Sequence, residues 1–314
     1  MDDLNSINNI VNTSLGQIIS FILLINMLFR PLRSLADKFN TLQMGTVAAS
    51  RVFNLINKKN MNEQSLGFND EKLYKGDILF KDLSFSYKTG ELVLDNVNLN
   101  IQSGKTIAIV GPTGSGKTTL INLITRFYPV KNGNIFIGET DINKLDLNVL
   151  RKNIGLILQD TFLFSDTIYN NITFYNKKSK VEINELIKKM GLMSFINSFP
   201  DGLDYQIGER GVFLSMGQRQ LVSFIRTYIS SAPILILDEA TSSMDSETES
   251  LIKKAINFLT KNKTSIIIAH RLSTIKNADK IIFLKEGSIM EKGTHEELIK
   301  LKGFYWSYYK TQLV

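Results

Sequence analysis

The chain has 314 residues, which is enough for more than one domain, and its apolar and charged fractions are those of a globular protein. It contains no cysteine, which excludes disulfides, thiolate metal sites and cysteine nucleophiles. The net charge of +7 favours an anionic partner. Because the sequence contains no basic run interleaved with aromatic residues, we expect this partner to be a lipid membrane and expect no nucleic acid.

The N-terminal stretch, residues 7–32, is predicted to form a membrane helix. Residues 18–29 are nearly all apolar, and a spanning helix needs about 20 apolar residues. Arg30, Arg33 and Lys38 come at the end of this stretch, and basic residues flank spanning helices mainly on the cytoplasmic side. The alternative interpretation is a buried or interfacial helix.

The residues that follow are predicted to extend this helix out of the membrane. Pro31 is expected to kink or interrupt it near the membrane boundary, and apolar residues then continue at helical spacing as far as Ile56. Residues 58–76 are mainly polar and are typical of a linker. The sequence therefore predicts a membrane part over residues 1–57, the linker, and a second domain over residues 77–314.

The second domain begins with a predicted antiparallel pair of strands within residues 83–101, where apolar residues alternate. From Thr106 onward strands and helices alternate, which indicates a mainly parallel sheet wrapped by helices. Residues 167–203 have a helical pattern without strongly apolar strands. We therefore expect an α/β domain with an antiparallel β subdomain and an inserted helical subdomain.

The strongest motif lies between an apolar strand, residues 106–110, and a helix whose apolar spacing continues to Phe127. It has the phosphate-loop pattern of Gly, four free positions and Gly-Lys-Thr. Glycines let backbone N–H groups point at phosphate oxygens, and the N-terminal end of the helix adds positive potential. The lysine is suited to the β- and γ-phosphates, and the threonine hydroxyl is placed to bind Mg²⁺. The loop consists of Gly111, Pro112, Thr113, Gly114, Ser115, Gly116, Lys117 and Thr118.

Polar side chains end three further apolar strands, at the edge where open α/β sheets bind ligands. Gln159 can reach Mg²⁺ or the attacking water, although taken alone it fits a surface glutamine. Asp238 can hold Mg²⁺ through its water shell, and Glu239 can deprotonate the water that attacks the γ-phosphate. His270 is placed to contact the γ-phosphate. The other histidine, His295, lies in a capping box and is interpreted as a surface residue.

Two predicted helix starts carry polar side chains that fit either capping or ligand binding. Ser215 and Gln218 have capping-box spacing around Gly217, and a helix N-terminus of this kind is also suited to an anion. Asp245 precedes a second predicted box, which begins at Ser246.

The order of these motifs resembles the nucleotide-binding domain of ATP-binding cassette (ABC) proteins, from about Ile78 to the C-terminus. Residues 206–211 resemble a loop of the exporter branch. Phe21, Pro31 and residues 48–53 resemble the last membrane helix of an exporter half-transporter, of the type that moves drugs or lipids. The resemblance implies the fold of a phosphate-loop NTPase, with ATP and Mg²⁺ as its ligands.

The resemblance also implies a role for each matching residue. Tyr87 would stack on adenine, although a strand aromatic also fits plain core. Thr119 would join the phosphate loop in binding ATP. Glu239 would be the general base, His270 would position it, and Gln159 would complete the Mg²⁺ site.

Two residues would act on a second copy of the domain. Ser215 and Gly217 would contact the ATP held by a second nucleotide-binding domain, in a homodimer or a heterodimer. Gln218 and Asp245 are also expected to bind nucleotide. ATP would close this dimer, and membrane-domain helices would convert closure into export. The resemblance places the domain on the cytoplasmic side of the cell membrane.

Two features depart from the family pattern. Met216 stands where many members have glycine. A half-transporter of this type has six membrane helices before the nucleotide-binding domain, whereas this sequence predicts at most one. We therefore expect a fragment, a truncated product or a chain that relies on another membrane subunit.

Two alternative functions stay open. The first is a soluble ABC-type ATPase, although such proteins usually carry two cassettes or a long coiled-coil insertion. The second is an uncoupled remnant that binds ATP without driving transport. Intact Lys117, Glu239 and His270 argue against lost chemistry but leave lost coupling open.

Overall fold

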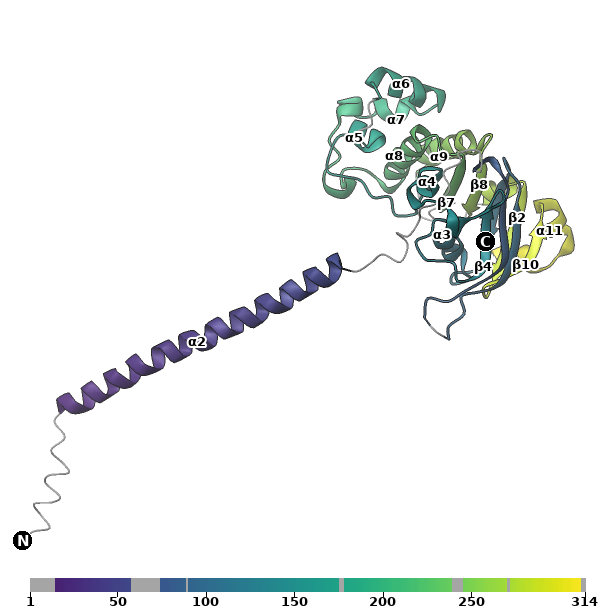
Figure 1. Ribbon diagram of the computed structural model, residues 1–314. Coiled ribbons are helices and arrows are strands. Elements are labelled where there is room, and N and C mark those ends of the chain that lie inside the picture. The colour runs from purple at the N-terminus through teal and green to yellow at the C-terminus, as the bar shows by residue number, and fades with distance from the viewer. Residues whose placement is uncertain are drawn as a thin grey trace, which may run out of the picture. The chain divides into compact units, whose positions relative to one another are not determined.

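The structure is a computed structural model that describes residues 15–57, 74–88, 90–174, 178–238, 245–269 and 272–311. The chain divides into two compact units, Met1–Asn60 and Met61–Val314. Within the described residues, the first unit is a single helix and the second contains every strand (Figure 1).

The helix of the first unit is α2 (Leu15–Ile56), which continues through Pro31. Pro31 was expected to kink or interrupt the helix. The interruption is excluded, because a proline disturbs the hydrogen bonding of one turn while the rest of this 42-residue helix keeps its own, and the kink stays a prediction. Large apolar side chains are exposed along its length, as in Phe21 and Leu42. Among the described residues, α2 is the one helix long and apolar enough to cross a membrane.

Two sheets form the framework of the second unit. One is antiparallel, in the order β2-β1-β4-β5, and the other has the order β10-β9-β3-β8-β7-β6. In the second sheet the strands from β9 to β6 are parallel, and β10 is antiparallel at the edge. The mainly parallel sheet and the antiparallel subdomain are therefore confirmed. The strands are β1 (Ile78–Phe85), β2 (Leu94–Ile101), β3 (Thr106–Val110), β4 (Asn132–Ile137), β5 (Thr140–Asp141), β6 (Ile154–Ile157), β7 (Ile234–Asp238), β8 (Thr264–Ile268), β9 (Lys280–Lys285) and β10 (Ser288–Gly293).

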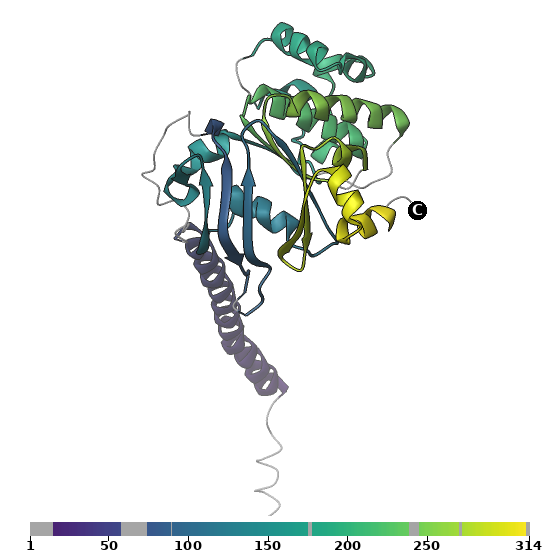
Figure 2. The ribbon, with the colours of Figure 1, turned by 90° about the vertical axis from the view of Figure 1, so that its right-hand side faces the viewer.

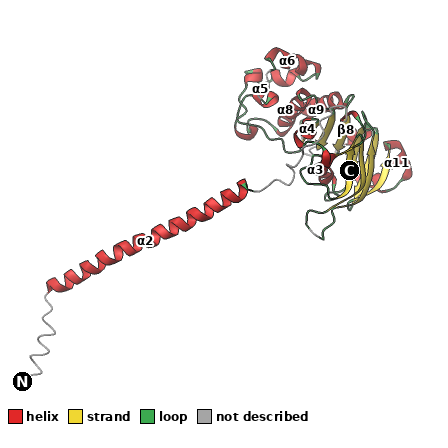
Figure 3. Ribbon diagram, viewed as in Figure 1, coloured by secondary structure: helices red, strands yellow, loops and turns green. Residues whose placement is uncertain are grey.

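Helices pack mainly against the six-stranded sheet, and α5 to α7 form the predicted helical insertion (Figure 3). The helices are α3 (Lys117–Ile124), α4 (Leu147–Lys152), α5 (Ile168–Thr173), α6 (Lys180–Lys189), α7 (Met193–Asn197), α8 (Met216–Ile229), α9 (Ser246–Thr260), α10 (Leu272–Lys276), α11 (His295–Leu301) and α12 (Phe304–Thr311). Short 3₁₀ helices lie at Ile142–Lys144, Gly202–Asp204 and Glu209–Gly211.

The central strands are buried on both faces, which explains their uninterrupted apolar sequences. In β3, Ala108 and Val110 belong to a core shared with α8 and α9. Ile107 and Ile109 belong to a second core, shared with β1, β2 and α3. Since both faces are filled, only the ends of these strands are free to carry polar functional groups.

Local structure departs from the sequence pattern in three places. Asn96 has a φ of 47°, and the pairing of β1 with β2 is irregular near it, so the alternation of β2 breaks at Asp95. Helix α3 ends at Ile124 and does not reach Phe127, because Arg126 takes a φ of 50° that stops it. Strands β4 and β5 complete the antiparallel sheet and were not predicted.

The interpretation of His295 as a plain surface residue is wrong. Its Nδ1 lies 2.8 Å from the hydroxyl of Tyr305, and its ring lies against that of Tyr309, both on α12. Helices α11 and α12 pack beside β10, where they are drawn in yellow (Figure 2). The predicted capping box of Thr294 and Glu297 is confirmed.

Candidate active site

The phosphate loop connects the end of β3 to the start of α3, as predicted. Gly111 has a φ of 152°, and Gly116, the residue before α3, has a φ of 101°. A Cβ atom on Gly111 would lie 2.0 Å from the carbonyl oxygen of Leu284, and one on Gly116 would lie 2.6 Å from Cδ2 of Leu94. Glycine at these two positions therefore lets the loop pass close to its neighbours.

Lys117 holds the loop from inside. Its Nζ donates hydrogen bonds of 2.8 Å to the carbonyl oxygens of Gly111 and Pro112, and lies 3.5 Å from Oγ of Ser115. Only 8% of Lys117 is exposed. The loop is thus curled around a buried ammonium group.

Segments that are distant in the sequence line one pocket of about 410 Å³ beside this loop. Lys117 and Thr118 meet Gln159 and Asp238 there, so the structure brings together residues that the sequence analysis took from three motifs. The lining residues are Val93, Thr113, Gly114, Gly116, Lys117, Thr118, Thr119, Gln159, Asp238 and Ile268.

Lys117 and Asp238 are oppositely charged groups that are both partly desolvated. Burial lowers the pKa of Lys117, and the charge of Asp238 opposes this shift. Burial raises the pKa of Asp238, and the charge of Lys117 opposes that shift. Charged ligands interact more strongly with such groups than with groups in bulk water.

The pocket also offers a set of oxygen donors. Thr118 has a hydroxyl, Gln159 an amide oxygen and Asp238 a carboxylate, and all three line the same pocket. Hard divalent cations such as Mg²⁺ prefer oxygen ligands, few of them from protein, so the chemistry of this set fits Mg²⁺.

Glu239 and His270 lie outside the described residues. The residues just before them are described: Asp238 is the last residue of β7, and it pairs in parallel register with Ile268 of β8. Both of these strand ends reach the pocket. The catalytic roles of Glu239 and His270 stay predictions.

Tyr87 lies outside the core, with 46% of its surface exposed. Its ring makes edge-to-face contacts with Phe85 and Tyr128, at centroid distances of 5.0 and 4.9 Å. Its hydroxyl lies 3.1 Å from Oγ1 of Thr119, a residue of the pocket. The exposed ring has the character of a stacking surface and is tied to the phosphate loop.

The residues at the start of α8 are not among those that line this pocket. Ser215 and Gln218 form the predicted capping box: Oγ of Ser215 accepts from the backbone N–H of Gln218, and Oε1 of Gln218 accepts from that of Ser215. Gly217 lies buried in the first turn. Gln159 lines a further pocket together with Met216 of α8, so it lies between the phosphate loop and this helix.

The predicted capping box at Ser246 and Glu249 is wrong by one residue. The N-cap of α9 is Asp245, whose Oδ1 accepts a hydrogen bond of 2.7 Å from the backbone N–H of Thr248. These hydrogen bonds lower the pKa of Asp245, since they favour the carboxylate. Asp245 is outside the pocket of the phosphate loop.

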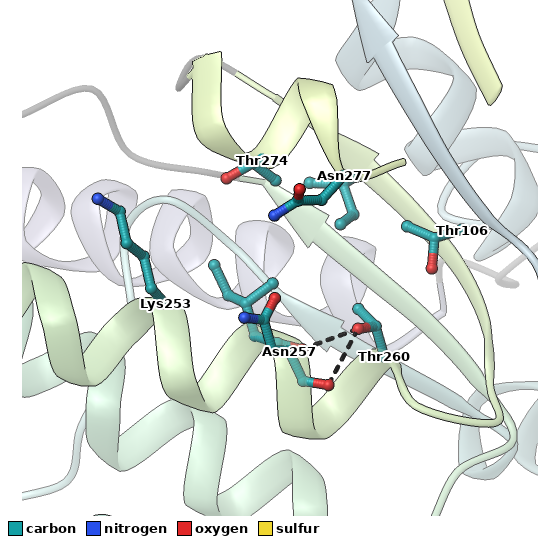
Figure 4. A pocket seen from close by; sticks show the side chains of 8 residues that line it. Thr106, Lys253, Asn257, Thr260, Thr274 and Asn277 are labelled. Carbon is teal, nitrogen blue, oxygen red and sulfur yellow. Dashed lines mark hydrogen bonds between the residues drawn. The ribbon is translucent and has the colours of Figure 1, made fainter. Parts of the chain in front are cut away.

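A smaller pocket of about 100 Å³ lies between α9 and α10 and contains no predicted site residue (Figure 4). Its polar lining includes Lys253, Asn257 and Thr274. Thr260 uses its hydroxyl within α9, where it donates to the carbonyl oxygen of Ile256. This smaller pocket therefore takes no part in the predicted site.

Sequence reasoning missed two residues of the pocket. Ile268 lies at the carboxyl end of β8, where its position in a parallel sheet was a usable signal. Val93 precedes β2 and reaches the pocket only because the antiparallel sheet lies beside the loop, which no local pattern indicates.

The chain matches a known protein family and is similar to several known proteins. Residues 94–242 match the family model described as ABC transporter. The chain is 45% identical over 288 residues to an ATP-dependent lipid A-core flippase of Blochmanniella floridana, which covers 91% of this chain and 49% of that protein. It is 42% identical over 299 residues to the multidrug resistance-like ATP-binding protein MdlB of Buchnera aphidicola, covering 95% of this chain and 51% of the relative.

A solved structure is similar along most of the chain. It is described as a bacterial Atm1-family ABC exporter with ATP bound, with a TM-score of 0.77 and 32% sequence identity over 92% of this chain and 51% of the other. The chain thus spans about half the length of the relatives it matches. Residues 94–242 thus match the ABC transporter family, and the solved structure that resembles most of the chain is an ABC exporter.

Proposed function

We propose that this chain binds ATP together with Mg²⁺ and hydrolyses the ATP to drive export across the cell membrane. The observation that carries the proposal is the pocket in which the buried Lys117 meets Thr118, Gln159 and Asp238. Phosphate-binding and cation-binding groups converge there, as phosphoryl transfer requires. The names of the relatives, a lipid flippase and multidrug proteins, support a transport role.

Four residues of the pocket, and Tyr87 beside it, have proposed tasks. Lys117 and the N–H groups of the loop neutralise and orient the phosphates. Thr118, Gln159 and Asp238 would hold Mg²⁺, which when bound supplies positive charge to the phosphate oxygens. Tyr87 would stack on the adenine ring.

The hydrolytic step is assigned to Glu239 and His270. Glu239 takes a proton from the water that attacks the γ-phosphate, and His270 positions Glu239 and that water. The electron pair of the broken bond stays on ADP, and the phosphoryl group leaves as inorganic phosphate.

A second nucleotide-binding domain would complete the site. Ser215, Gly217, Gln218 and Asp245 are outside the pocket of their own chain, which supports contact with ATP on a partner. Closure of such a dimer would move membrane-domain helices, and α2 would be one of them. The apolar surface of α2 supports a position in the membrane. The nucleotide-binding domain would lie on the cytoplasmic side.

Glu239→Gln tests the assignment in the full chain in detergent. We expect ATP affinity to be retained, hydrolysis to fall by about 100-fold or more, as loss of a general base predicts, and a dimer to accumulate with ATP. Titration calorimetry, phosphate release and light scattering measure the three results. Glu247→Gln, an exposed glutamate in the first turn of α9, is the matched control. Hydrolysis at the original rate in Glu239→Gln would remove Glu239 from its proposed role.

A further inference from the structure

A series of hydrogen bonds between three polar side chains leads from the surface of α3 to the pocket beside the phosphate loop. Nδ2 of Asn122 donates a hydrogen bond of 3.2 Å to the hydroxyl of Tyr87. That hydroxyl lies 3.1 Å from Oγ1 of Thr119, which lines the pocket. Asn122 itself is not among the residues that line the pocket, so it reaches the site only through Tyr87.

The three side chains can donate hydrogen bonds in one direction, toward the pocket. The Asn122 amide donates to the phenolic oxygen. Either hydroxyl can be the donor between Tyr87 and Thr119, so the phenolic proton is available to Oγ1 of Thr119. The hydroxyl proton of Thr119 is then free to donate into the pocket. Each bond in such a series polarises the next, so the last donor is stronger than an isolated hydroxyl.

We infer that Asn122 is a positioning residue for the nucleotide, acting through the hydroxyl of Tyr87 to turn the hydroxyl of Thr119 toward a phosphate oxygen. The inference rests on the proposed function, since it takes the pocket to bind ATP. It gives Tyr87 two separable tasks: the ring faces the base, and the hydroxyl serves the phosphates.

The surroundings of Tyr87 support this division. The rings of Phe85 and Tyr128 contact the Tyr87 ring and each other, while nearly half of Tyr87 stays exposed. The ring is therefore held by packing even without its hydroxyl. Loss of the hydroxyl alone should therefore remove the hydrogen bond to Thr119 and leave the position of the Tyr87 ring unchanged.

The test is a double-mutant cycle of Asn122→Ala and Tyr87→Phe in the full chain, with Asn148→Ala on α4 as the exposed-asparagine control. Binding of ATP and of inorganic tripolyphosphate, each with Mg²⁺, is measured by calorimetry. We expect each single variant to weaken both ligands by about three- to tenfold, which corresponds to one hydrogen bond. The double variant should be no weaker than Tyr87→Phe, and KM for ATP should rise while kcat is unchanged.

Other outcomes overturn the inference in distinguishable ways. If Asn122→Ala weakens binding equally in the wild-type and Tyr87→Phe backgrounds, Asn122 does not act through the hydroxyl. If both single variants weaken ATP but not tripolyphosphate, the series does not serve the phosphates. If the wild-type chain binds both ligands and Asn122→Ala changes the affinity for neither, the inference about Asn122 is wrong and the proposed function stands. If the wild-type chain binds neither ligand, the proposed function fails as well.

Discussion

Replacing Lys117 with Met should remove most of the affinity for ATP. Methionine keeps the length and apolar stem of lysine but lacks the ammonium group. A hydrogen bond from this ammonium to a phosphate oxygen is charge-assisted and worth about 1.5–3 kcal/mol. We therefore expect the affinity for ATP to fall by about 10- to 150-fold.

The same change should alter folding much less, because two effects oppose each other. The carbonyl oxygens of Gly111 and Pro112 lose the hydrogen bonds that they now accept at 2.8 Å. An acceptor left buried and unpaired costs about 1–3 kcal/mol. Against this, the substitution removes the cost of burying a charge, which is the burial that lowers the pKa of Lys117. We expect the Tm of Lys117→Met to differ from wild type by only a few degrees.

Calorimetry with ATP and with AMP checks this reasoning. AMP lacks the β- and γ-phosphates, so its affinity should be the same in Lys117→Met and wild type. Lys253→Met is the matched control, because Lys253 is 48% exposed and pairs with Glu249 on the surface of α9. An unchanged affinity for ATP would refute the assignment of Lys117 to the phosphates. Equal losses for ATP and AMP would refute it too, since they would indicate general damage to the site.

Two further changes probe the loop and the C-terminal helices. Gly111→Ala should abolish ATP binding and lower the Tm, because the added Cβ atom would lie 2.0 Å from the carbonyl oxygen of Leu284. If the variant gave the same calorimetric titration and melting curve as the wild type, this prediction would be wrong. Burial lowers the pKa of His295, so the unfolded state binds its proton more readily, and stability should fall as pH drops below about 6.5. His295→Asn should flatten this slope in urea unfolding measured across pH, and an unchanged slope would exclude His295 as its source.

The parts of the site that depend on neighbours in the chain were predictable from the sequence. The spacing of Gly111, Gly116 and Lys117 requires only that a strand, a tight loop and a helix follow each other, and the structure has this order. The capping box of Ser215 and Gln218 is equally local, since its two hydrogen bonds join residues three apart. Local spacing also predicted the apolar strands and the helical insertion.

Some predictions failed because tertiary context overrode local signals. Pro31 was expected to kink or interrupt α2, and the helix continues through it, because a long helix tolerates one disturbed turn. The apolar spacing that continues to Phe127 predicted a longer α3, whereas Arg126 ends that helix and Phe127 lies under the guanidinium of Arg151. The polar side chain of His295 and its place in a capping box predicted a surface position, whereas α12 packs onto α11 and brings Tyr305 and Tyr309 against it.

The sequence by itself determined the motifs, the family they resemble and the type of fold. Only the tertiary structure decided which side chains share a pocket and in what electrostatic state. Val93, Gln159 and Asp238 line one pocket with Lys117, because β8, β7 and β6 follow β3 in the sheet and the antiparallel sheet lies beside the loop. Long-range contacts set the strand order, and they also bury Lys117 and Asp238, which shifts the pKa values of both groups. Periodicity along the chain does not encode such contacts.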